Sequence, residues 1–251
     1  MAEIAAVSDL QAVVVKPEFK ALWECNMKVV DDINRRQQGW SQVGKVEFLA
    51  DSQSTSVVPA YLKRQQGYTT RSLLHPIKGI ATLRREYRML ISVIKKGVGV
   101  APPLYFEEAS AQRAVLVVEA LEQHRSLDQL SPGNRIEADQ AIDLAAELVA
   151  RVHRLGICHG CLYPKHLFWL SPEVTGVADM RLIDWEKARY SPRRRYSRVR
   201  DLDSLNRHAS GWSLRQRYRF LVQYLGKPVG DPEIRVWWQR LCGKLQNKQS
   251  R

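Results

Sequence analysis

The residues best equipped for chemistry lie in one stretch in the middle of the chain, His159–Phe168. Two histidines, His159 and His166, stand on either side of Cys161. Imidazole and thiolate groups bind metal ions, and both can take up protons. A helical pattern stops at a glycine just before this stretch, and a short apolar run follows it, which predicts a tight loop between a helix and a strand. Further along, an apolar strand ends in Asp184, whose carboxylate could hold a divalent cation.

The pattern H-G-C-L-x-x-x-H resembles the catalytic loop of protein kinases, H-R-D-L-x-x-x-N. Cys161 takes the position of the catalytic Asp, and His166 takes that of the metal-binding Asn. Asp184 matches the Asp of the D-F-G motif, which holds Mg²⁺ on the nucleotide phosphates. Trp185 and Glu186 replace the Phe and Gly of that motif, so we expect the segment after Asp184 to be less free to flip.

Two charged residues upstream match the lysine–glutamate pair of kinases. Lys63 ends an apolar strand that resembles the third kinase strand, where a lysine contacts the α- and β-phosphates of ATP. Residues Ala81–Lys96 predict an amphipathic helix with Glu86 at the edge of its apolar face. That face consists of Leu83, Tyr87, Leu90, Ile91 and Ile94. We expect Glu86 to pair with Lys63; the alternative is an exposed glutamate beside two arginines.

Two weaker signals concern the rest of a nucleotide site. Glu119 and Leu121 end an apolar strand and resemble the hinge that presents backbone groups to adenine. An ordinary strand end that binds no ligand would show the same sequence pattern. Gly39 and Gly44 could flank a loop over phosphates. Their spacing does not match G-x-G-x-x-G, and glycines in a strand-rich stretch are usually turns.

The motifs Lys63–Arg64, L-R-R-E-Y, G-V-x-x-P-P, H-G-C-L-Y-x-x-H and L-I-D-x-E-K-A-R occur in one order. Together they resemble the lipopolysaccharide kinase group of bacterial kinase-like proteins, more closely its InaA branch, from about Arg35 to about Leu225. The resemblance implies an α+β, two-lobed protein-kinase-like fold, with a small β-rich N-lobe containing one main helix and a larger helical C-lobe. We expect an N-terminal helical extension at 1–34, the N-lobe at 35–121 and the C-lobe at 122–251. Asp201 and Asp203 should lie near the start of a helix.

The resemblance also implies a function. Active members of the group transfer the γ-phosphate of ATP to a heptose of the lipopolysaccharide core, with Mg²⁺ or Mn²⁺, in the cytoplasm of Gram-negative bacteria. The implied catalytic residues are Cys161, His159 and Asp184. The implied ATP-binding residues are Lys63, Glu86, Glu119, Leu121 and Gly39, and the metal ligands are Asp184 and His166. The alternative is an inactive pseudokinase that binds nucleotide or an anionic glycolipid in the envelope stress response.

Cys161 decides between these two. A thiol with a pKa near ~8.5 is mostly neutral at pH 7 and accepts protons poorly. Losing a positioned base costs about 10²–10⁴-fold, so a slow kinase is expected unless His159 converts the thiol to thiolate. A different interpretation takes Cys158 and Cys161 as a C-x-x-C redox or metal site, but no partner pair or thioredoxin-like context supports it.

Charge indicates an anionic partner. The chain has 251 residues and a formal net charge of +13, with its excess of arginine in the last third. These arginines include Arg193–Arg195, Arg198, Arg200, Arg207, Arg215, Arg217 and Arg219. Such a surface attracts anions such as nucleic acid, anionic lipid headgroups or a phosphorylated glycolipid, unless it is only a solvated face. The family resemblance implies the lipopolysaccharide core or another anionic glycolipid as the partner, with a peripheral contact to the inner face of the inner membrane. Nucleic acid is disfavoured, because no recognition module or base-stacking platform accompanies the charge.

Other features favour a cytoplasmic protein. The four cysteines show no disulfide spacing, which predicts a reducing compartment. We expect no transmembrane helix, because no run of about 18 apolar residues occurs. The first fifteen residues do not read as a signal peptide, since acidic Glu3 and Asp9 stand where a basic start is needed.

Overall fold

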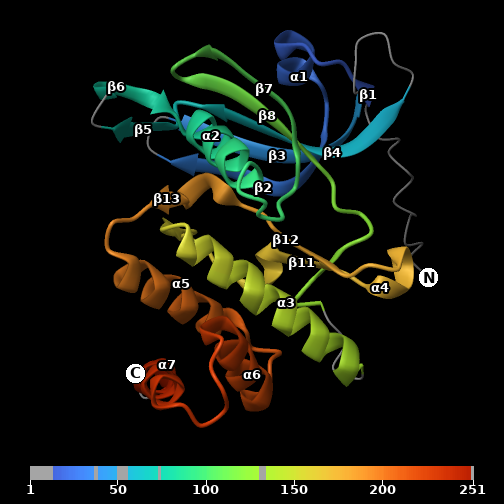
Figure 1. Ribbon diagram of the computed structural model, residues 1–251. Helices are drawn as coiled ribbons and strands as arrows, with labels where there is room; N and C mark the ends of the chain where they lie inside the picture. Colours follow the sequence, from blue (N-terminus) through green and yellow to red (C-terminus); the bar gives the residue numbers. More distant parts are fainter. Residues whose placement is uncertain (1–13, 37–38, 50–55, 73–74, 130–133, 250–251) are drawn as a thin grey trace, which may run out of the picture. The chain divides into compact units, whose positions relative to one another are not determined.

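The computed structural model describes residues 14–36, 39–49, 56–72, 75–129 and 134–249 (Figure 1). The chain forms two compact units. The first comprises Met1–Tyr87 and Pro102–Ala120, and the second comprises Arg88–Ala101 and Leu121–Arg251.

A curled antiparallel sheet dominates the first unit. Its strands run in the order β1-β3-β4-β8-β7, with β2 added on β3, and only the short β1 pairs parallel. The strands are β1 Val14–Val15, β2 Lys28–Arg36, β3 Gly39–Leu49, β4 Val57–Gln66, β7 Pro103–Ser110 and β8 Arg113–Glu119. A separate hairpin, β5 Thr69–Ser72 and β6 His75–Ala81, leads into helix α2, Thr82–Ile94.

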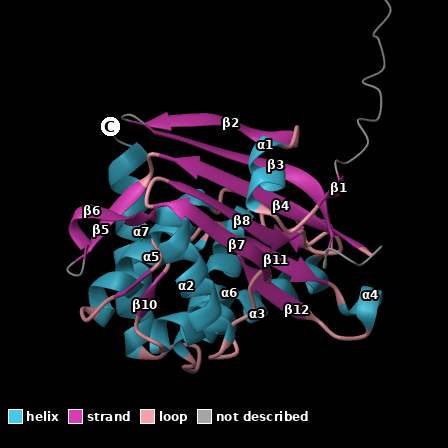
Figure 2. Ribbon diagram, turned by 90° about the horizontal axis from the view of Figure 1, so that it is seen from above, coloured by secondary structure: helices cyan, strands magenta, loops and turns pink. Residues whose placement is uncertain are grey.

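Helix α1, Phe19–Glu24, packs on this sheet (Figure 2). Its fully buried Leu22 joins the core formed by alternate residues of β3, β4 and β8. Arg64 of β4 fixes the end of α1, because its guanidinium donates to the carbonyls of Trp23 at 2.6 Å and Cys25 at 3.0 Å. The chain then enters β2, so the helical extension predicted at 1–34 is wrong from Lys28 onward.

Helix α2 confirms the predicted amphipathic helix with a different buried face. The buried side chains are Leu83, Glu86, Met89, Leu90 and Val93. Residues on this i, i+3, i+4, i+7 stripe lie on one side of an α-helix. The predicted Ile94 is instead exposed, and Glu86 lies at the centre of the buried stripe rather than at its edge. The positive φ of Gly97 (67°) then turns the chain after the helix.

The second unit is mainly helical. Its central helix α3, Arg135–Arg154, begins at the N-cap Asn134 and buries a row of alanines and branched residues. Around it are α4 Pro172–Thr175, α5 Arg194–His208, α6 Leu214–Leu225 and α7 Pro232–Gln249. Short strands form two small sheets, β9 Arg125–Ser126 with β11 Leu167–Leu170 and β12 Asp179–Leu182, and β10 Ile157–Cys158 with β13 Arg189–Tyr190. The 3₁₀ helices η1 Pro164–His166 and η2 Trp185–Lys187 complete it.

Several of the excess arginines form ion pairs and hydrogen bonds inside this unit. Arg215 and Arg219 of α6 pair with Asp139 and Asp143 of α3 at 2.9 and 2.5 Å. Arg217 donates to the carbonyls of Asn206 and Ala209. The predicted anion-binding surface is therefore smaller than the sequence indicated.

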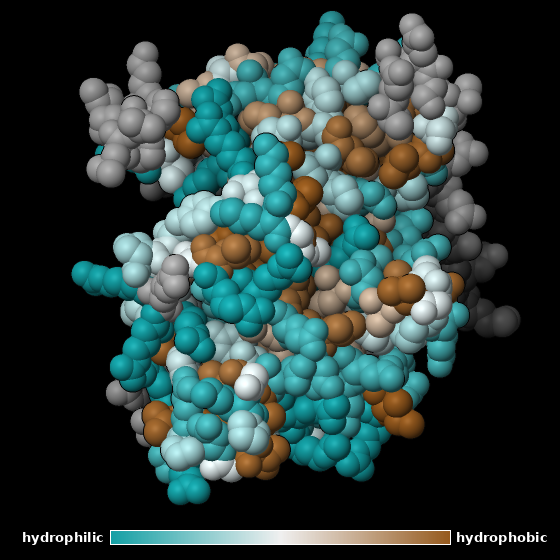
Figure 3. All heavy atoms as spheres, in the orientation of Figure 1, coloured by the Kyte–Doolittle hydropathy of each residue, from teal (hydrophilic) through white to brown (hydrophobic). Residues whose placement is uncertain are grey.

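The exposed arginines that remain are on and beside α5. Arg193, Arg195 and Arg200 are exposed and make no side-chain hydrogen bond or ion pair within the described residues. On the face drawn in Figure 3, hydrophilic side chains predominate over the helices of the second unit. Among the described residues, no helix combines the length and hydropathy that a membrane span requires.

Candidate active site

The first unit forms the lysine–glutamate pair that the sequence predicted. Lys63 Nζ lies 2.6 Å from Glu86 Oε1. Lys63 is in register with Val43 and Leu116 in the middle of the sheet, which holds its backbone. The Glu86 side chain is only 2% exposed, while that of Lys63 is 18% exposed. The lysine ammonium is thus anchored by a buried carboxylate while part of its side chain stays exposed.

The other residues predicted to contact nucleotide lie on the same sheet. Gly39 and Gly44 both belong to β3 and do not flank a loop, so that prediction is wrong. A Cβ on Gly39 would lie 2.6 Å from the Gln66 carbonyl oxygen, which accounts for the glycine by packing. Residues 37–38, where β2 turns into β3, lie outside the described residues.

The predicted hinge residues lie where the chain leaves the sheet. The Glu119 amide donates to the Pro102 carbonyl at 2.9 Å, and the next amide donates to Pro59 at 2.8 Å. Leu121 follows as a buried residue of the second unit. Their contact with adenine stays a prediction.

In the second unit, the loop after β10 is held from behind by Asp201. This fully buried carboxylate accepts the amides of His159 at 2.6 Å and Gly160 at 2.8 Å. It also faces His153 Nε2 at 3.1 Å. Burial alone would raise the pKa of Asp201, but hydrogen bonding and charge from His153 and the attraction of His159 hold it below its ordinary value. Asp201 lies in the middle of α5, so its predicted place near a helix start is wrong.

His159 is a structural member of the loop. Its side chain is buried, its Nε2 lies 3.1 Å from the Ile183 carbonyl, and its ring packs edge-on against Trp185. Burial lowers the pKa of His159 to about 4, so the imidazole is neutral at pH 7 and donates from Nε2. This contact fixes Ile183 one residue before Asp184. His159 therefore acts on the site by position rather than by proton transfer.

His166 and Asp184 face each other across this loop. His166 Nδ1 donates to the Cys161 carbonyl at 2.8 Å, which leaves Nε2 as the acceptor, 3.7 Å from Asp184 Oδ2. A metal-binding histidine commonly donates its other ring N–H to a carbonyl in this way. Asp184 is the one non-glycine residue of the described chain with positive φ, at 64°, a conformation typical of functional sites.

These two side chains fit a divalent cation as two protein ligands. Within the described residues no group of three or more His, Cys, Asp or Glu forms a complete cage. Mg²⁺ usually takes one or two protein ligands and completes its shell with phosphates and water, which matches a nucleotide-bound ion. Imidazole suits Mn²⁺ better than Mg²⁺.

Trp185 anchors the segment after Asp184. Its side chain is fully buried, and its Nε1 donates to the Leu182 carbonyl at 2.8 Å. A flip of this segment like that of a D-F-G motif would break that hydrogen bond and expose the indole. The contacts support the expectation that this segment flips less readily than a D-F-G motif.

Lys187 rather than His159 is the basic group that acts on Cys161. The thiol is buried, and the positive charge of Lys187 favours its thiolate form. Burial and the charge of Asp184 raise the pKa of Cys161 despite Lys187, so the thiol is neutral at pH 7. Activation to thiolate by His159 is thus not supported. Lys165, four residues further on, is exposed and makes no side-chain hydrogen bond or ion pair within the described residues.

Gly160 explains why the loop reads H-G-C. Its φ is +82°, and a Cβ there would lie 3.0 Å from the Lys187 carbonyl oxygen and 3.2 Å from Lys187 Cβ. Only glycine adopts this backbone without strain. Its lack of a side chain lets η2 approach the loop and brings Lys187 to Cys161.

The C-x-x-C interpretation gains no support. All four cysteines are free thiols, and Cys158 donates to Asp201. Burial and the nearby Asp201 charge raise the pKa of Cys158 to about 11. A redox pair needs a lowered thiol pKa.

Comparison with known proteins identifies the family of this chain. The model of the lipopolysaccharide kinase (Kdo/WaaP) family matches residues 20–224. The chain belongs to the lipopolysaccharide kinase (Kdo/WaaP) family. Its motifs had indicated this group, and that prediction is confirmed. No curated protein matches the sequence.

Solved structures confirm the α+β kinase-like fold of this family member. One is described as WaaP in complex with acyl carrier protein; it is 20% identical, with a TM-score of 0.62, covering 90% of this chain and 92% of that one. Another is an aminoglycoside-3'-phosphotransferase of type VIII, 14% identical, with a TM-score of 0.53, covering 86% of this chain and 92% of that one. At these identities the likeness establishes the fold alone.

Two important residues escaped prediction. Asp201 lies some forty residues after the loop it holds, and only its burial in α5 reveals the contact. Lys187 belongs to the D-x-E-K-A-R motif that marked the family, yet nothing in its spacing indicates that it reaches Cys161. The motif itself was the available signal for Lys187.

Proposed function

We propose that this protein is an ATP-dependent kinase that transfers the γ-phosphate to a hydroxyl of a lipopolysaccharide core sugar, slowly because Cys161 replaces the catalytic Asp. The observation that carries the proposal is the pairing of His166 Nε2 with Asp184 Oδ2 at 3.7 Å beside the catalytic loop. Phosphoryl transfer depends mainly on positioning and charge neutralisation, and this pair supplies a cation site for both.

Separate residues would bind the nucleotide and the metal ion. Lys63, held by Glu86, would neutralise the nucleotide phosphates, while Glu119 and Leu121 would contact the adenine. Asp184 and His166 would hold Mg²⁺ or Mn²⁺, which lowers the repulsion between the phosphates and the incoming oxygen.

Removal of the proton from the acceptor hydroxyl is the step that this site supports least. When the sugar oxygen bonds to phosphorus and the bridging oxygen leaves with ADP, the hydroxyl proton must leave as well. The buried Cys161 thiol, whose pKa is raised by burial and by the charge of Asp184, is a poor acceptor for it. In a loose transition state this proton leaves late, so the reaction slows but need not stop.

Transfer of radiolabelled phosphate from ATP to core oligosaccharide tests the proposal, with Mg²⁺ and with Mn²⁺. Label should appear with the wild-type protein and not with Asp184→Ala. Equal incorporation by both would contradict the proposed catalytic role, and no incorporation by either would contradict the kinase.

The second candidate is a pseudokinase that binds nucleotide or an anionic glycolipid in the envelope stress response. The buried thiol of Cys161, with its raised pKa, favours it specifically. It predicts thermal stabilisation by ATP without any product. Detectable turnover on a native acceptor excludes this candidate.

We further propose a cytoplasmic location with a peripheral contact to the inner face of the inner membrane of a Gram-negative bacterium. Arg193, Arg195 and Arg200 support it, because exposed arginines without internal partners attract anionic headgroups. Sedimentation with vesicles containing anionic lipid, but not with neutral ones, is the expected result.

A further inference from the structure

A chain of hydrogen bonds runs from the C-terminal helices of the second unit to the catalytic loop. Arg198 Nε of α5 lies 2.7 Å from the Tyr224 hydroxyl of α6, and this hydroxyl lies 2.8 Å from His153 Nδ1 of α3. His153 Nε2 lies 3.1 Å from Asp201 Oδ2, the carboxylate that accepts the loop amides. Tyr224, His153 and Asp201 are all buried. The network thus joins three helices to the loop.

The direction of each hydrogen bond follows from the groups involved. A guanidinium only donates, so the Tyr224 oxygen accepts from Arg198. Burial raises the pKa of Tyr224 to about 12, so the phenol keeps its proton and donates it to His153 Nδ1. The His153 proton then lies on Nε2 and is donated to Asp201, since an ionised carboxylate only accepts. Tyr224 therefore selects the histidine tautomer that Asp201 requires.

His153 fixes the rotation of the Asp201 carboxylate. Oδ2 accepts from the His159 amide at 2.6 Å and from His153, while Oδ1 accepts from the Gly160 amide at 2.8 Å. Without a donor on His153 Nε2, the carboxylate would lose a partner that keeps each oxygen opposite its own amide. The two amides come directly before Cys161, so the position of the loop depends on this orientation.

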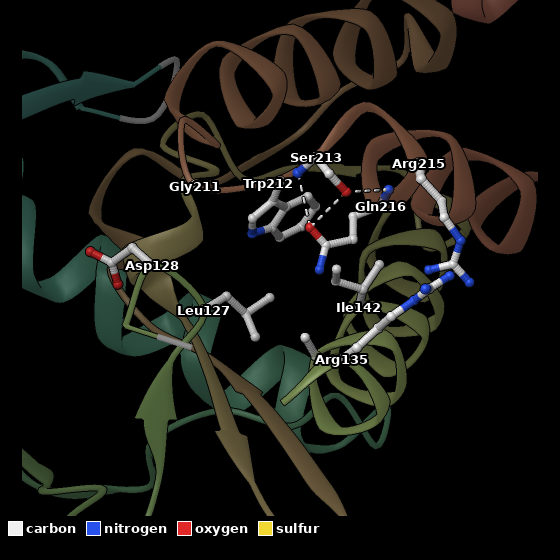
Figure 4. Close-up of a pocket in the computed structure, with 10 residues that line it drawn as sticks. Leu127, Asp128, Arg135, Ile142, Gly211, Trp212, Ser213, Arg215 and Gln216 are labelled. Carbon is white, nitrogen blue, oxygen red and sulfur yellow. Dashed lines mark hydrogen bonds between the residues drawn. The ribbon is translucent and has the colours of Figure 1, made fainter. Parts of the chain in front are cut away.

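Aromatic packing holds the Tyr224 ring in place independently of its hydroxyl. The ring stacks on Phe220 with an interplanar angle of 8°. Phe220 in turn packs on Trp212, which precedes the Ser213–Gln216 capping box at the start of α6 (Figure 4). A phenylalanine in place of Tyr224 would keep this packing and lose only the hydrogen bonds.

The C-terminal helix α7 helps to hold the arginine at the end of the network. The Arg198 guanidinium lies over the rings of Tyr224 and Trp237, 5.3 and 5.5 Å from their centroids. Contacts of this kind attract a cation to the face of an aromatic ring. Trp237 belongs to α7 and is buried. Packing of this helix therefore bears on the donor that Tyr224 receives.

We infer that Tyr224 and Arg198 are positioning residues of the catalytic loop, which act through His153 and Asp201. Tyr224 orients the imidazole, the imidazole orients the carboxylate, and the carboxylate holds the two loop amides. The inference rests on the proposed kinase function only for its effect on turnover. The loop amides report the state of the network without any substrate.

Amide hydrogen exchange followed by NMR tests the inference on the full chain. Tyr224→Phe should speed exchange at the His159 and Gly160 amides by about tenfold, the effect of about one buried hydrogen bond. The Leu127 amide, whose hydrogen bond lies outside the network, should exchange as in the wild type. The matched control is Tyr218→Phe on the same helix, because the Tyr218 hydroxyl has no hydrogen-bond partner within the described residues.

Turnover gives a second readout. Tyr224→Phe should lower kcat about fivefold or more and leave KM for ATP within about twofold, because the network holds the loop and not the lysine–glutamate pair. Arg198→Met should act in the same direction but less, since the bond from Tyr224 to His153 remains. Arg198→Lys should recover part of that loss, because lysine keeps a donor and the charge.

The outcomes separate this inference from the kinase proposal. If the wild type transfers no phosphate, the kinase proposal fails and the exchange rates still decide the inference. Wild-type exchange at both loop amides of folded Tyr224→Phe overturns it, and so does an acceleration that the Leu127 amide shares equally. Should Tyr224→Phe not fold, Arg198→Met, at a partly exposed position, decides by the same amides. A proton found on Nδ1 of His153 in nitrogen–proton correlation spectra of the wild type would also overturn the inference.

Discussion

Replacing Cys161 by Asp should accelerate this protein. The substitution restores the carboxylate that kinases place in the loop. The positive charge of Lys187, which acts on the thiol, would also act on this carboxylate. A general base contributes about 10²–10⁴-fold. Pairing with Lys187 lowers the basicity of the new carboxylate, so we expect a gain towards the low end, about tenfold to a hundredfold.

The stability cost should be tolerable. The site is 3% exposed, and a poorly satisfied buried polar group costs about 1–3 kcal/mol. Lys187 offsets part of this, while the nearby Asp184 adds repulsion. For a chain of this size 1 kcal/mol shifts Tm by about 2–4 °C, so the loss should stay below about 10 °C.

Rates are measured as radiolabelled transfer to core oligosaccharide and as ATP hydrolysis. Cys161→Asn is the matched control, because it has the shape of Asp without the charge, and it should gain nothing. Cys161→Ala should leave the slow rate nearly unchanged, since the thiol is neutral. If Cys161→Asp folds, binds ATP and is no faster than Cys161→Asn, the missing carboxylate is not what limits this protein.

Three further outcomes follow from the described contacts. Saturating ATP with Mg²⁺, at about 100 Kd, should stabilise the protein by about 2.7 kcal/mol, and Lys63→Met should lose most of this melting shift while the exposed Lys28→Met keeps it. Asp201→Asn should cost about 3 kcal/mol in urea unfolding, because it loses charge-assisted hydrogen bonds from two loop amides. The folded-state pKa of His159 is depressed to about 4, so the unfolded chain binds more protons between that value and its ordinary pKa of about 6.5. Unfolding free energy should therefore fall as pH drops through this window, and His159→Gln should flatten that slope; an unchanged slope would refute the buried neutral imidazole.

How well the sequence predicts this site depends on how far apart in the sequence the contacting residues lie. Lys63, Glu86 and Asp184 were found because each occupies a fixed place in a strand or helix pattern. The buried face of α2 was misjudged by about one position, since tertiary packing decides which side of an amphipathic helix faces inward. Pattern reasoning also extended α1 into β2, where pairing with β3 overrides local spacing.

Contacts between segments distant in the sequence could not be predicted from local patterns. Asp201 lies in a helix whose start was misplaced, so its role behind the loop could not be read. The arginines of α6 looked free in the sequence because their aspartate partners on α3 lie 76 residues away. Charge counts report composition, and only packing shows which charges remain available.

The close approach at Gly160 constrains how this loop can change over generations. Any side chain there meets Lys187, and positive φ penalises every residue but glycine. A reversion to H-R-D by single steps would therefore pass through strained intermediates if position 160 changed first. Position 161 can mutate alone, which makes H-G-D the accessible route to an acidic loop. Backbone geometry at position 160 therefore limits which side chains this loop can carry beside position 161.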